Sequence, residues 1–217
     1  MSPEAADKMV RHLDLLRAAN ERFNLTAIKD EDWLWAHVLD SLSCVPEVEA
    51  SLEGPLADLG SGGGFPGVPV ALATGRDVTL VESVKKKAAF LADVVAALSL
   101  PGRVAAVRAE ELALSEGGAF SVVTARALSA LASLVELGSP LLKRGGRLIC
   151  LKGGPRAEEL ESGAAAARLC GMSYSGSRAV AIPGSDATRT IVVYERTGPA
   201  KIHLPRRTGM AQRQPLA

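Results

Sequence analysis

The sequence predicts an α/β protein in which helices cover both faces of a doubly wound, mostly parallel sheet. From residue 55 onward, short aliphatic runs alternate with segments of helical periodicity, as in parallel sheets built from strand–helix units. The runs are apolar throughout, which is typical of strands that are buried on both faces. A length of 217 residues with 47% hydrophobic residues fits one such domain with an appendage.

Two helices are expected before the first strand. Residues 3–20 carry Met9, Val10, Leu13 and Leu16 at helical spacing. A second helix is expected over 31–43, with Pro46 just beyond its end. We therefore predict an N-terminal helical appendage, residues 1–54.

The core, residues 55–196, is predicted to contain seven strands. Its first five strands are expected to be parallel, and helices separate them. The final two form an antiparallel hairpin, because a turn-rich Pro-Gly-Ser-Asp segment joins them. The strands are expected at Leu56–Leu59, Val78–Val81, Arg103–Val107, Ser121–Thr124, Arg147–Leu151, Met172–Ile182 and Arg189–Glu195, and the helices at 67–74, 84–98, 129–143 and 155–169.

The last segment, residues 197–217, is rich in proline and is expected to be irregular. From Arg196 to the end there are five basic residues and no acid. Since the whole chain has a net charge of +1, the remainder carries −4. A basic tail on such a body is compatible with contact to a polyanion. Charge alone, however, favours a solvated, disordered tail.

Composition excludes several classes of protein. Cys44, Cys150 and Cys170 form no C-x-x-C pair and are accompanied by only three histidines, so neither a disulfide framework nor a zinc site is expected. The thiols are predicted to be buried and free. No apolar run approaches the ~20 residues of a membrane span, and the N-terminus does not resemble a signal peptide. These features predict a soluble cytoplasmic protein.

A glycine-rich loop, Asp58–Gly67, follows the first strand and opens a helix. Gly62-x-Gly64-x-x-Gly67 matches the dinucleotide fingerprint, although one such match is weakly specific. The same segment, taken from Asp58, gives D-x-G-x-G-x-G, a pattern typical of nucleosides without a pyrophosphate. A carboxylate would repel a pyrophosphate but attract the cationic amino group of a methionine. Asp58 therefore favours S-adenosylmethionine, and NAD stays open.

Charged residues follow the next three strands, where ligands bind in such sheets. Glu82 ends the second strand and is expected to accept hydrogen bonds from ribose hydroxyls, or else to cap the next helix. Glu110 follows the third strand, beside an adenine or in a solvated loop. Arg126 follows the fourth and is expected to pair with a cofactor carboxylate or a substrate phosphate, or to form a structural ion pair.

The end of the fourth strand, Val122–Ala127, excludes some methyl acceptors. It lacks the [DN]-P-P-[YF] segment of exocyclic-amine methylation, the cysteine of pyrimidine C5 methylation and the acids of a metal-dependent enzyme. Guanine N7 tolerates this absence, because its lone pair attacks a sulfonium methyl without losing a proton. Orientation and electrostatics then suffice for catalysis. This reasoning permits N7 without identifying it.

The motifs together resemble the glucose-inhibited division protein B (RsmG) family of bacterial 16S ribosomal RNA guanine-N7 methyltransferases, over nearly the whole chain. The matching motifs are Asn24-Leu25-Thr26, His37-x-Leu39-Asp40-Ser41, the loop with its Phe65-Pro66-Gly67-x-Pro69 ending, Lys85-Lys86-Lys87-x-x-Phe90-Leu91, Ala109-Glu110, Ala125-Arg126-Ala127, Leu151-Lys152-Gly153 and Leu204-Pro205-Arg206-Arg207-x-Gly209. The chain is short for the family around 111–119, which predicts a trimmed surface loop there.

The resemblance implies a class I methyltransferase fold, S-adenosylmethionine as cofactor without a metal, and 16S ribosomal RNA or the small ribosomal subunit as partner of a monomer. The cofactor-binding residues would be Gly60, Gly62, Phe65, Glu82, Ser83, Ala109, Glu110 and Arg126. His37, Asp40 and Arg126 become candidates for a catalytic role near the pocket mouth. Lys152, Arg206 and Arg207 become candidates for RNA phosphate contacts.

Two other functions remain open at this point. An NAD-dependent Rossmann dehydrogenase would use the same loop and the same ribose carboxylate. A non-catalytic RNA-binding or ribosome-assembly protein would keep the basic residues and a vestigial pocket. The sequence does not separate naked RNA from an assembled subunit as substrate, nor does it reveal which groups hold the target base.

Overall fold

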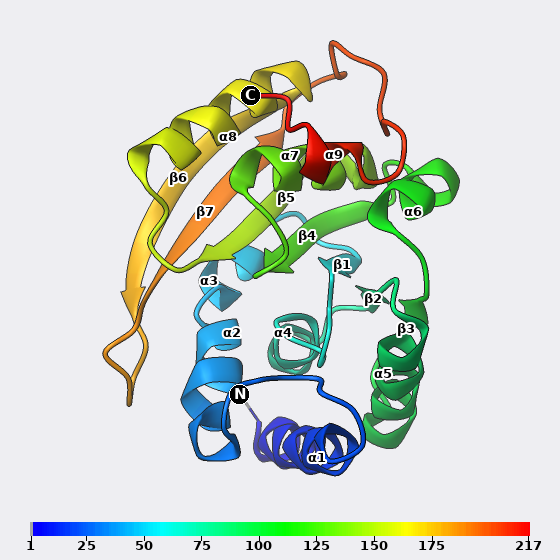
Figure 1. Cartoon of the computed structure of the whole chain (residues 1–217), viewed down its shortest axis with the longest axis vertical. Helices are drawn as coiled ribbons and strands as arrows, with labels where there is room; N and C mark the ends of the chain where they lie inside the picture. Colours follow the sequence, from blue (N-terminus) through cyan, green and yellow to red (C-terminus); the bar gives the residue numbers. More distant parts are fainter. Residues whose placement is uncertain (1) are drawn as a thin grey trace.

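A computed structural model describes residues 2–217 and contains one seven-stranded sheet with the order β3-β2-β1-β4-β5-β7-β6 (Figure 1). Helices cover both of its faces, and the sheet twists strongly from one edge to the other. The strands are β1 Leu56–Leu59, β2 Val78–Val81, β3 Gly102–Ala105, β4 Phe120–Arg126, β5 Leu142–Lys152, β6 Met172–Ala181 and β7 Thr188–Arg196. Their arrangement is the doubly wound, mostly parallel sheet that the sequence predicts.

Strand polarity sets the position of the functional residues. The first five strands pair in parallel, with Asp58 of β1 opposite Leu80 of β2 and Thr124 of β4. Their carboxyl ends therefore meet at one edge, where ligands bind in open α/β sheets. β7 joins β5 in antiparallel pairing, and β6 joins β7, as expected for the closing hairpin.

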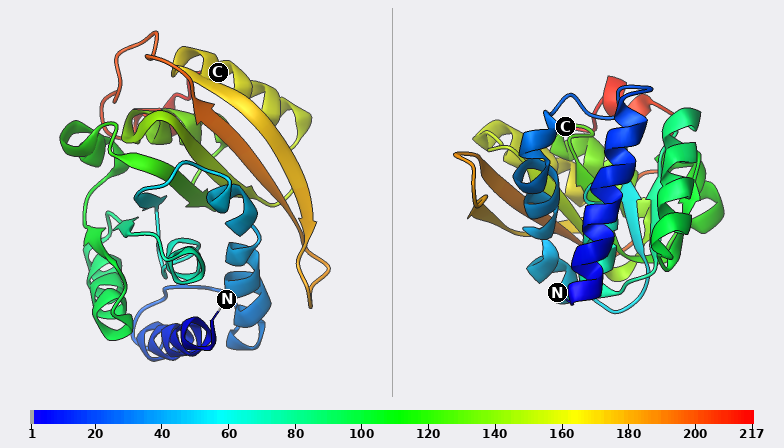
Figure 2. Two further views of the ribbon diagram at one scale, coloured as in Figure 1. Left: turned by 180° about the vertical axis from the view of Figure 1, so that it is seen from behind. Right: turned by 90° about the horizontal axis from the view of Figure 1, so that it is seen from below.

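Each face of the sheet has its own hydrophobic core. On one face, α1 (Pro3–Asn20), α4 (Gly67–Thr74) and α5 (Lys85–Leu98) pack together, and on the other α7 (Leu131–Gly138) and α8 (Ala157–Leu169) do so (Figures 1 and 2). The first core includes Met9, Leu16 and Trp33 from the N-terminal segment together with Leu80 and Phe90. The N-terminal helices are thus part of the core of the domain rather than a separate layer outside it.

The second N-terminal helix is less regular than predicted. Instead of one helix over 31–43, the chain forms a 3₁₀ turn, Asp30–Asp32, a π-helix, Leu34–Leu39, and the short helix α2, Asp40–Leu42. A further helix, α3 (Val45–Glu49), follows, with Pro46 in its first turn, where a missing N–H costs little. π-Helices occur frequently at functional sites because they redirect side chains.

Two elements in the middle of the chain differ clearly from the prediction. Residues 109–116 form a helix, α6 (Ala109–Glu116), where a surface loop was expected. The helix predicted over 129–143 ends at Gly138, a 3₁₀ turn follows, and β5 already begins at Leu142. The extra length of β5 is explained by pairing, because Leu142 lies opposite Phe120 in β4.

The C-terminal segment is folded against the body, although its charge alone favoured a disordered tail. It includes a short helix, α9 (Met210–Arg213), which contacts α7 (Figure 1). Ala211 is only 2% exposed, and Leu204 and Leu216 pack against the core. The three cysteines are buried free thiols, as predicted. Within residues 2–217, no helix is long and apolar enough to cross a membrane.

Candidate functional site

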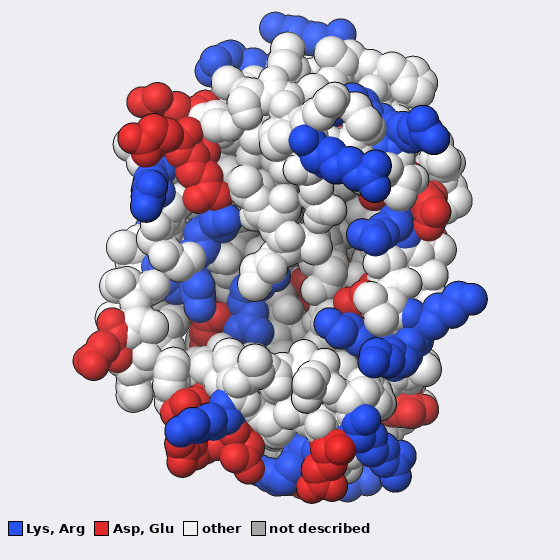
Figure 3. Space-filling view, in the orientation of Figure 1, with Lys and Arg blue, Asp and Glu red and all other residues white. Residues whose placement is uncertain are grey.

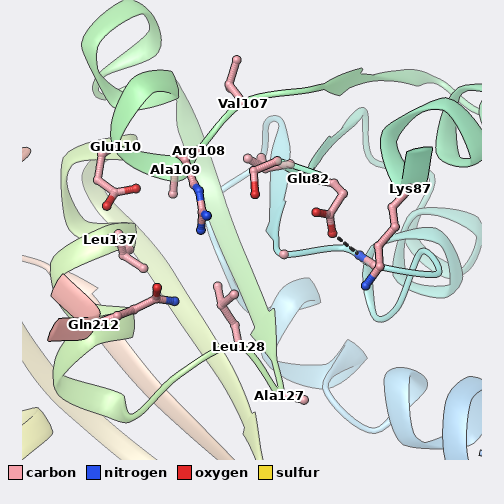
Figure 4. A pocket seen from close by; sticks show the side chains of 14 residues that line it. Glu82, Lys87, Val107, Arg108, Ala109, Glu110, Ala127, Leu128, Leu137 and Gln212 are labelled. Carbon is pink, nitrogen blue, oxygen red and sulfur yellow. Dashed lines mark hydrogen bonds between the residues drawn. The ribbon is translucent and has the colours of Figure 1, made fainter. Parts of the chain in front are cut away.

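A cavity of about 240 Å³ lies at the carboxyl ends of the central parallel strands (Figure 4). The glycine-rich loop, the ends of β2 and β4 and the first turn of α6 surround it. Six of the eight residues predicted to bind the cofactor line this cavity: Gly60, Gly62, Glu82, Ser83, Ala109 and Glu110. The lining is completed by Val81, Lys87, Val107, Arg108, Ala127, Leu128, Leu137 and Gln212.

Glycine is required at two positions of the loop. Gly60 has a φ of +67°, and a Cβ there would lie 2.7 Å from Cδ1 of Leu128 across the cavity. A Cβ on Gly67, where α4 begins, would lie 2.7 Å from Oδ2 of Asp58. Such contacts are not tolerated by real side chains, so these glycines let the loop turn tightly against its neighbours.

Asp58 shapes the loop and does not face the cavity, which corrects the sequence interpretation. Its Oδ2 accepts a hydrogen bond from the Gly67 amide at 3.1 Å, and its Oδ1 accepts one from Oγ1 of Thr124 at 2.9 Å. The residue is fully buried, and this burial raises the pKa of the carboxyl to about 6. The carboxyl of Asp58 therefore ties β1 to β4 and to the start of α4.

Glu82 is held in place by backbone amides on both sides. Its Oε2 accepts a hydrogen bond from the amide of Gly62 at 3.1 Å, and its Oε1 accepts one from the amide of Val84 at 2.8 Å. The residue is 7% exposed and lines the cavity. Each carboxylate oxygen has a second lone pair. The side chain is consequently fixed by the protein while it keeps acceptor capacity for a ligand.

Glu110 lies on the opposite wall from Glu82 (Figure 4). It stands in the first turn of α6 and is 9% exposed, so it is not the solvated loop acid considered above. Its Oε1 accepts a hydrogen bond from the amide of Gly209, in the C-terminal segment, at 2.7 Å. The cavity therefore has a fixed carboxylate on each of two facing walls.

Phe65 and Arg126, the other two predicted cofactor residues, lie outside the cavity lining. The ring of Phe65 is stacked between His12, at 4.7 Å, and His37, at 4.5 Å between ring centroids. The guanidinium carbon of Arg126 lies 5.5 Å from the centre of the same ring, a cation–π arrangement. Phe65 thus joins the glycine-rich loop to the N-terminal helices and to the end of β4.

His37 is neutral, and both of its ring nitrogens are engaged. Nδ1 lies 3.0 Å from NH2 of Arg126, and because arginine only donates, Nδ1 accepts. Nε2 then carries the proton and donates to Oγ1 of Thr26 at 3.0 Å. Burial, followed by the charge of Arg126, lowers the pKa of His37 to about 3. This histidine positions Arg126 and offers no free lone pair for proton abstraction.

Asp40 is a buried acceptor for two arginines. Its Oδ2 accepts from NH1 of Arg126 at 2.7 Å and from NH2 of Arg189 at 3.0 Å, and its Oδ1 accepts from Nε of Arg189. Arg126 also donates to the carbonyl of Ala36 at 2.8 Å. The three residues that were candidates for catalysis therefore form one network with Arg189, which fixes the direction of the Arg126 side chain.

His12 connects α1 to the glycine-rich loop, and it predicts a pH dependence of stability. It is 1% exposed, its Nε2 donates to the carbonyl of Gly63 at 2.8 Å, and burial lowers its pKa to about 4. An unfolded histidine binds a proton below pH 6.5, whereas His12 in the folded protein does so only near 4. The free energy of unfolding should thus fall by about 3 kcal/mol as the pH drops from 7 to 4.

The His12→Gln variant checks this contribution, because an amide can donate to Gly63 without titrating. In chemical denaturation between pH 7 and 4, this variant should lose about 3 kcal/mol less than the wild type. The remaining loss contains the contribution of His37, whose pKa is lowered in the same direction. An identical pH dependence in both proteins would show that His12 does not stay neutral in the folded state.

Two of the three predicted RNA contacts are engaged in ion pairs. Nζ of Lys152 lies 2.7 Å from Oε1 of Glu159, and Nε of Arg206 donates to Oε1 of Glu136 at 2.6 Å. Arg207 is exposed. Figure 3 shows basic side chains on both sides of a hollow in this face of the molecule.

The sequence interpretation overlooked several residues of the site. Lys87 and Arg108 line the cavity, although neither is among the cofactor residues that the sequence predicts. Gln212 reaches the cavity from the C-terminal segment, and Arg189 reaches Asp40 from β7. Arg108 is the N-cap of α6, and its amide donates to Oε2 of Glu111, but arginine is not a capping residue and gives no sequence signal. Gln212 and Arg189 carry no local signal.

Comparisons with known proteins agree with this geometry. The family model described as GidB, rRNA small subunit methyltransferase G, matches residues 5–184. The chain is 36% identical over 216 residues to ribosomal RNA small subunit methyltransferase G of Alkaliphilus oremlandii, with 97% of this chain and 90% of the relative covered. It is 42% identical over 197 residues to the protein of the same name from Stenotrophomonas maltophilia, with 89% and 87% covered.

Solved structures of methyltransferases have the same fold. The 1,6-didemethyltoxoflavin-N1-methyltransferase of Burkholderia thailandensis superposes with a TM-score of 0.58 at 16% identity, covering 91% of this chain and 92% of that one. Precorrin-6y C5,15-methyltransferase of Geobacter metallireducens gives 0.56 at 11% identity, covering 72% and 86%. The predicted class I methyltransferase fold is confirmed by these likenesses. From its sequence relatives, the chain belongs to the rRNA small subunit methyltransferase G family.

Proposed function

We propose that the cavity binds S-adenosylmethionine. The observation that carries this proposal is the pair of fixed carboxylates, Glu82 and Glu110, on facing walls of a cavity at the carboxyl ends of parallel strands. Glu82 suits the ribose, because a carboxylate held by two amides can still accept from two hydroxyls. Between the walls, Val107, Ala109 and Leu128 supply apolar surface suited to the faces of an adenine.

The reaction that we infer is methyl transfer to N7 of a guanine in 16S ribosomal RNA. When bound, S-adenosylmethionine supplies an electrophilic methyl group on its sulfonium. The N7 lone pair needs no general base, and His37, the histidine nearest to Arg126, has both ring nitrogens occupied. The segment Val122–Ala127 contains no cysteine nucleophile and no acid. The site thus suits an acceptor that reacts without losing a proton.

The side chains around Arg126 would orient the reactants. Phe65 stacks with two histidines and holds the loop, while Asp40 and His37 hold the guanidinium of Arg126 near the Phe65 ring. A guanidinium so fixed can pair with the carboxylate of the cofactor or with a phosphate of the RNA. Lys152 and Arg207 are proposed to contact phosphates. Arg206 is paired with Glu136 and would act indirectly, by fixing the position of the C-terminal segment.

Methylation of unmodified small-subunit RNA with labelled S-adenosylmethionine tests this function. We expect label in 7-methylguanosine, detected by nucleoside analysis after digestion, and at one position of the RNA. Naked RNA and assembled small subunits should be compared, because the sequence leaves the substrate form open. Label in another nucleoside would refute N7 as the acceptor, and no incorporation into either substrate would refute the proposed reaction.

Two alternatives are distinguished by binding and by genetics. An NAD-dependent dehydrogenase would bind NAD and not S-adenosylmethionine in calorimetric titrations. Membership of a methyltransferase family favours S-adenosylmethionine. A non-catalytic assembly protein would leave RNA methylation in cells unchanged when Arg126 is replaced by alanine, whereas the proposed enzyme would lose it.

A further inference from the structure

The C-terminal segment is anchored to α7 by polar contacts with buried partners. Two guanidinium nitrogens of Arg206, Nε and NH2, donate to the carboxylate of Glu136, which is only 3% exposed. Oγ of Ser133 donates to the carbonyl of Ala211 at 2.7 Å, and Ala211 is itself buried. Fork-like pairs between arginine and a carboxylate fix geometry as well as charge. The backbone around residues 206–211 is therefore held in one position relative to the sheet.

The same segment reaches the cavity through its main chain. The amide of Gly209 donates to Oε1 of Glu110 at 2.7 Å, a contact between residues 99 positions apart. Gly209 has a φ of +82°, which is unfavourable for other residues and turns the chain into α9. One wall of the cavity thus depends on residues that follow the last strand.

This arrangement of the C-terminal segment places the side chain of Gln212 at the cavity. It lines the cavity beside Leu137 and Glu110, across from Glu82 (Figure 4). Its amide is exposed and makes no hydrogen bond to the other residues drawn in Figure 4. An amide offers one donor group and one acceptor, and both are free to face a ligand.

The polar groups on this wall match an adenine. If the ribose is at Glu82, the base extends away from it, between Val107 and Leu128 and toward Glu110 and Gln212. An adenine edge presents the N6 amino donor beside a ring-nitrogen acceptor, and a glutamine amide pairs with both at once. Glu110 alone supplies acceptors only, so it cannot satisfy a ring nitrogen.

We propose that the C-terminal segment forms the adenine-binding wall of the cofactor pocket and that Gln212 hydrogen-bonds the edge of the base. This inference rests on the proposal that the cavity binds S-adenosylmethionine. It assigns to the basic tail a role in cofactor recognition, in addition to any contact with RNA.

Calorimetric titration of the full-length protein with S-adenosylhomocysteine tests the assignment. Gln212→Ala should weaken binding about tenfold, the effect of losing one or two neutral hydrogen bonds. Gln214→Ala is the matched control, because the same side chain stands two residues away, exposed and outside the cavity lining. It should bind like the wild type.

An analogue of S-adenosylhomocysteine that lacks the N6 amino group distinguishes a lost contact with the base from a general disturbance of the pocket. Wild type should bind this purine analogue more weakly than S-adenosylhomocysteine, and Gln212→Ala should reduce that difference, because the two changes remove the same hydrogen bond. Wild-type affinity in Gln212→Ala, or an unchanged difference between the ligands, would overturn the assignment. Failure of the wild type itself to bind S-adenosylhomocysteine would instead refute the proposed cofactor.

Discussion

Replacing Arg126 by alanine is expected to lower the rate of RNA methylation by at least about 100-fold, because misplacement of reactants by about 1 Å has an effect of this size. The side chain is the junction between β4, the π-helix and Phe65. The variant should also lose about 3 kcal/mol of stability, since removal of one partner leaves a buried charge less well paired. Asp40 would keep its contact with Arg189, so the fold should persist.

Single-turnover methylation with saturating RNA and cofactor measures this effect apart from binding, and thermal unfolding in the same buffer measures the stability. Arg126→Lys keeps the charge and loses the planar fork, so it should recover only part of the rate. Arg103→Ala is a suitable control, because Arg103 is half exposed, pairs with Glu116 and does not line the cavity. It should retain the wild-type rate. A folded Arg126→Ala protein with wild-type turnover would contradict the role assigned to this residue.

Replacing Glu82 by alanine is expected to weaken binding of S-adenosylmethionine by about 100-fold or more. Each hydrogen bond to a charged group contributes about 1.5–3 kcal/mol, and we expect the carboxylate to accept one from each of the two ribose hydroxyls. The same change removes the acceptor of the Gly62 and Val84 amides, which loosens the loop around the ligand. Isothermal titration calorimetry with the purified protein gives the affinity directly.

Glu82→Gln is the intermediate variant, because it removes one loop amide contact and one ribose contact together. The amide retains one acceptor oxygen, so binding should be weakened about tenfold rather than about 100-fold. Asp93→Ala removes an exposed acid of α5 that does not line the cavity, and its affinity should equal that of the wild type. If Glu82→Ala bound the cofactor as tightly as Asp93→Ala does, the ribose would have to lie elsewhere.

The central strands could be predicted from the sequence because their signals are local. β1 and β2 are four-residue runs with every residue buried, and their observed bounds equal the predicted ones. α1 and α4 also begin and end where the sequence placed them. In each case a short stretch of chain contains its own pattern and its own boundary residues.

The parts that were missed depend on contacts between distant residues. Arg189 and Asp40 are 149 positions apart, and Gly209 and Glu110 are 99 apart. The tail is basic and rich in proline, so nothing within it indicates that Glu136 and Ser133 will hold it. The position of Asp58 before the turn predicts a ligand contact, whereas parallel pairing with β4 places Thr124 beside it and closes it off from the cavity.

Because α1 contacts the glycine-rich loop, the loop is not an independent module that folds without the N-terminal helix. His12 on α1 supports the carbonyl of Gly63 and one face of Phe65, and Leu16 lies 3.1 Å from where a Cβ on Gly63 would stand. A loop transplanted into another sheet without this helix would lose the surface against which it folds. The N-terminal helix and the loop thus fold as one unit, although residues 21–57 of the chain separate them.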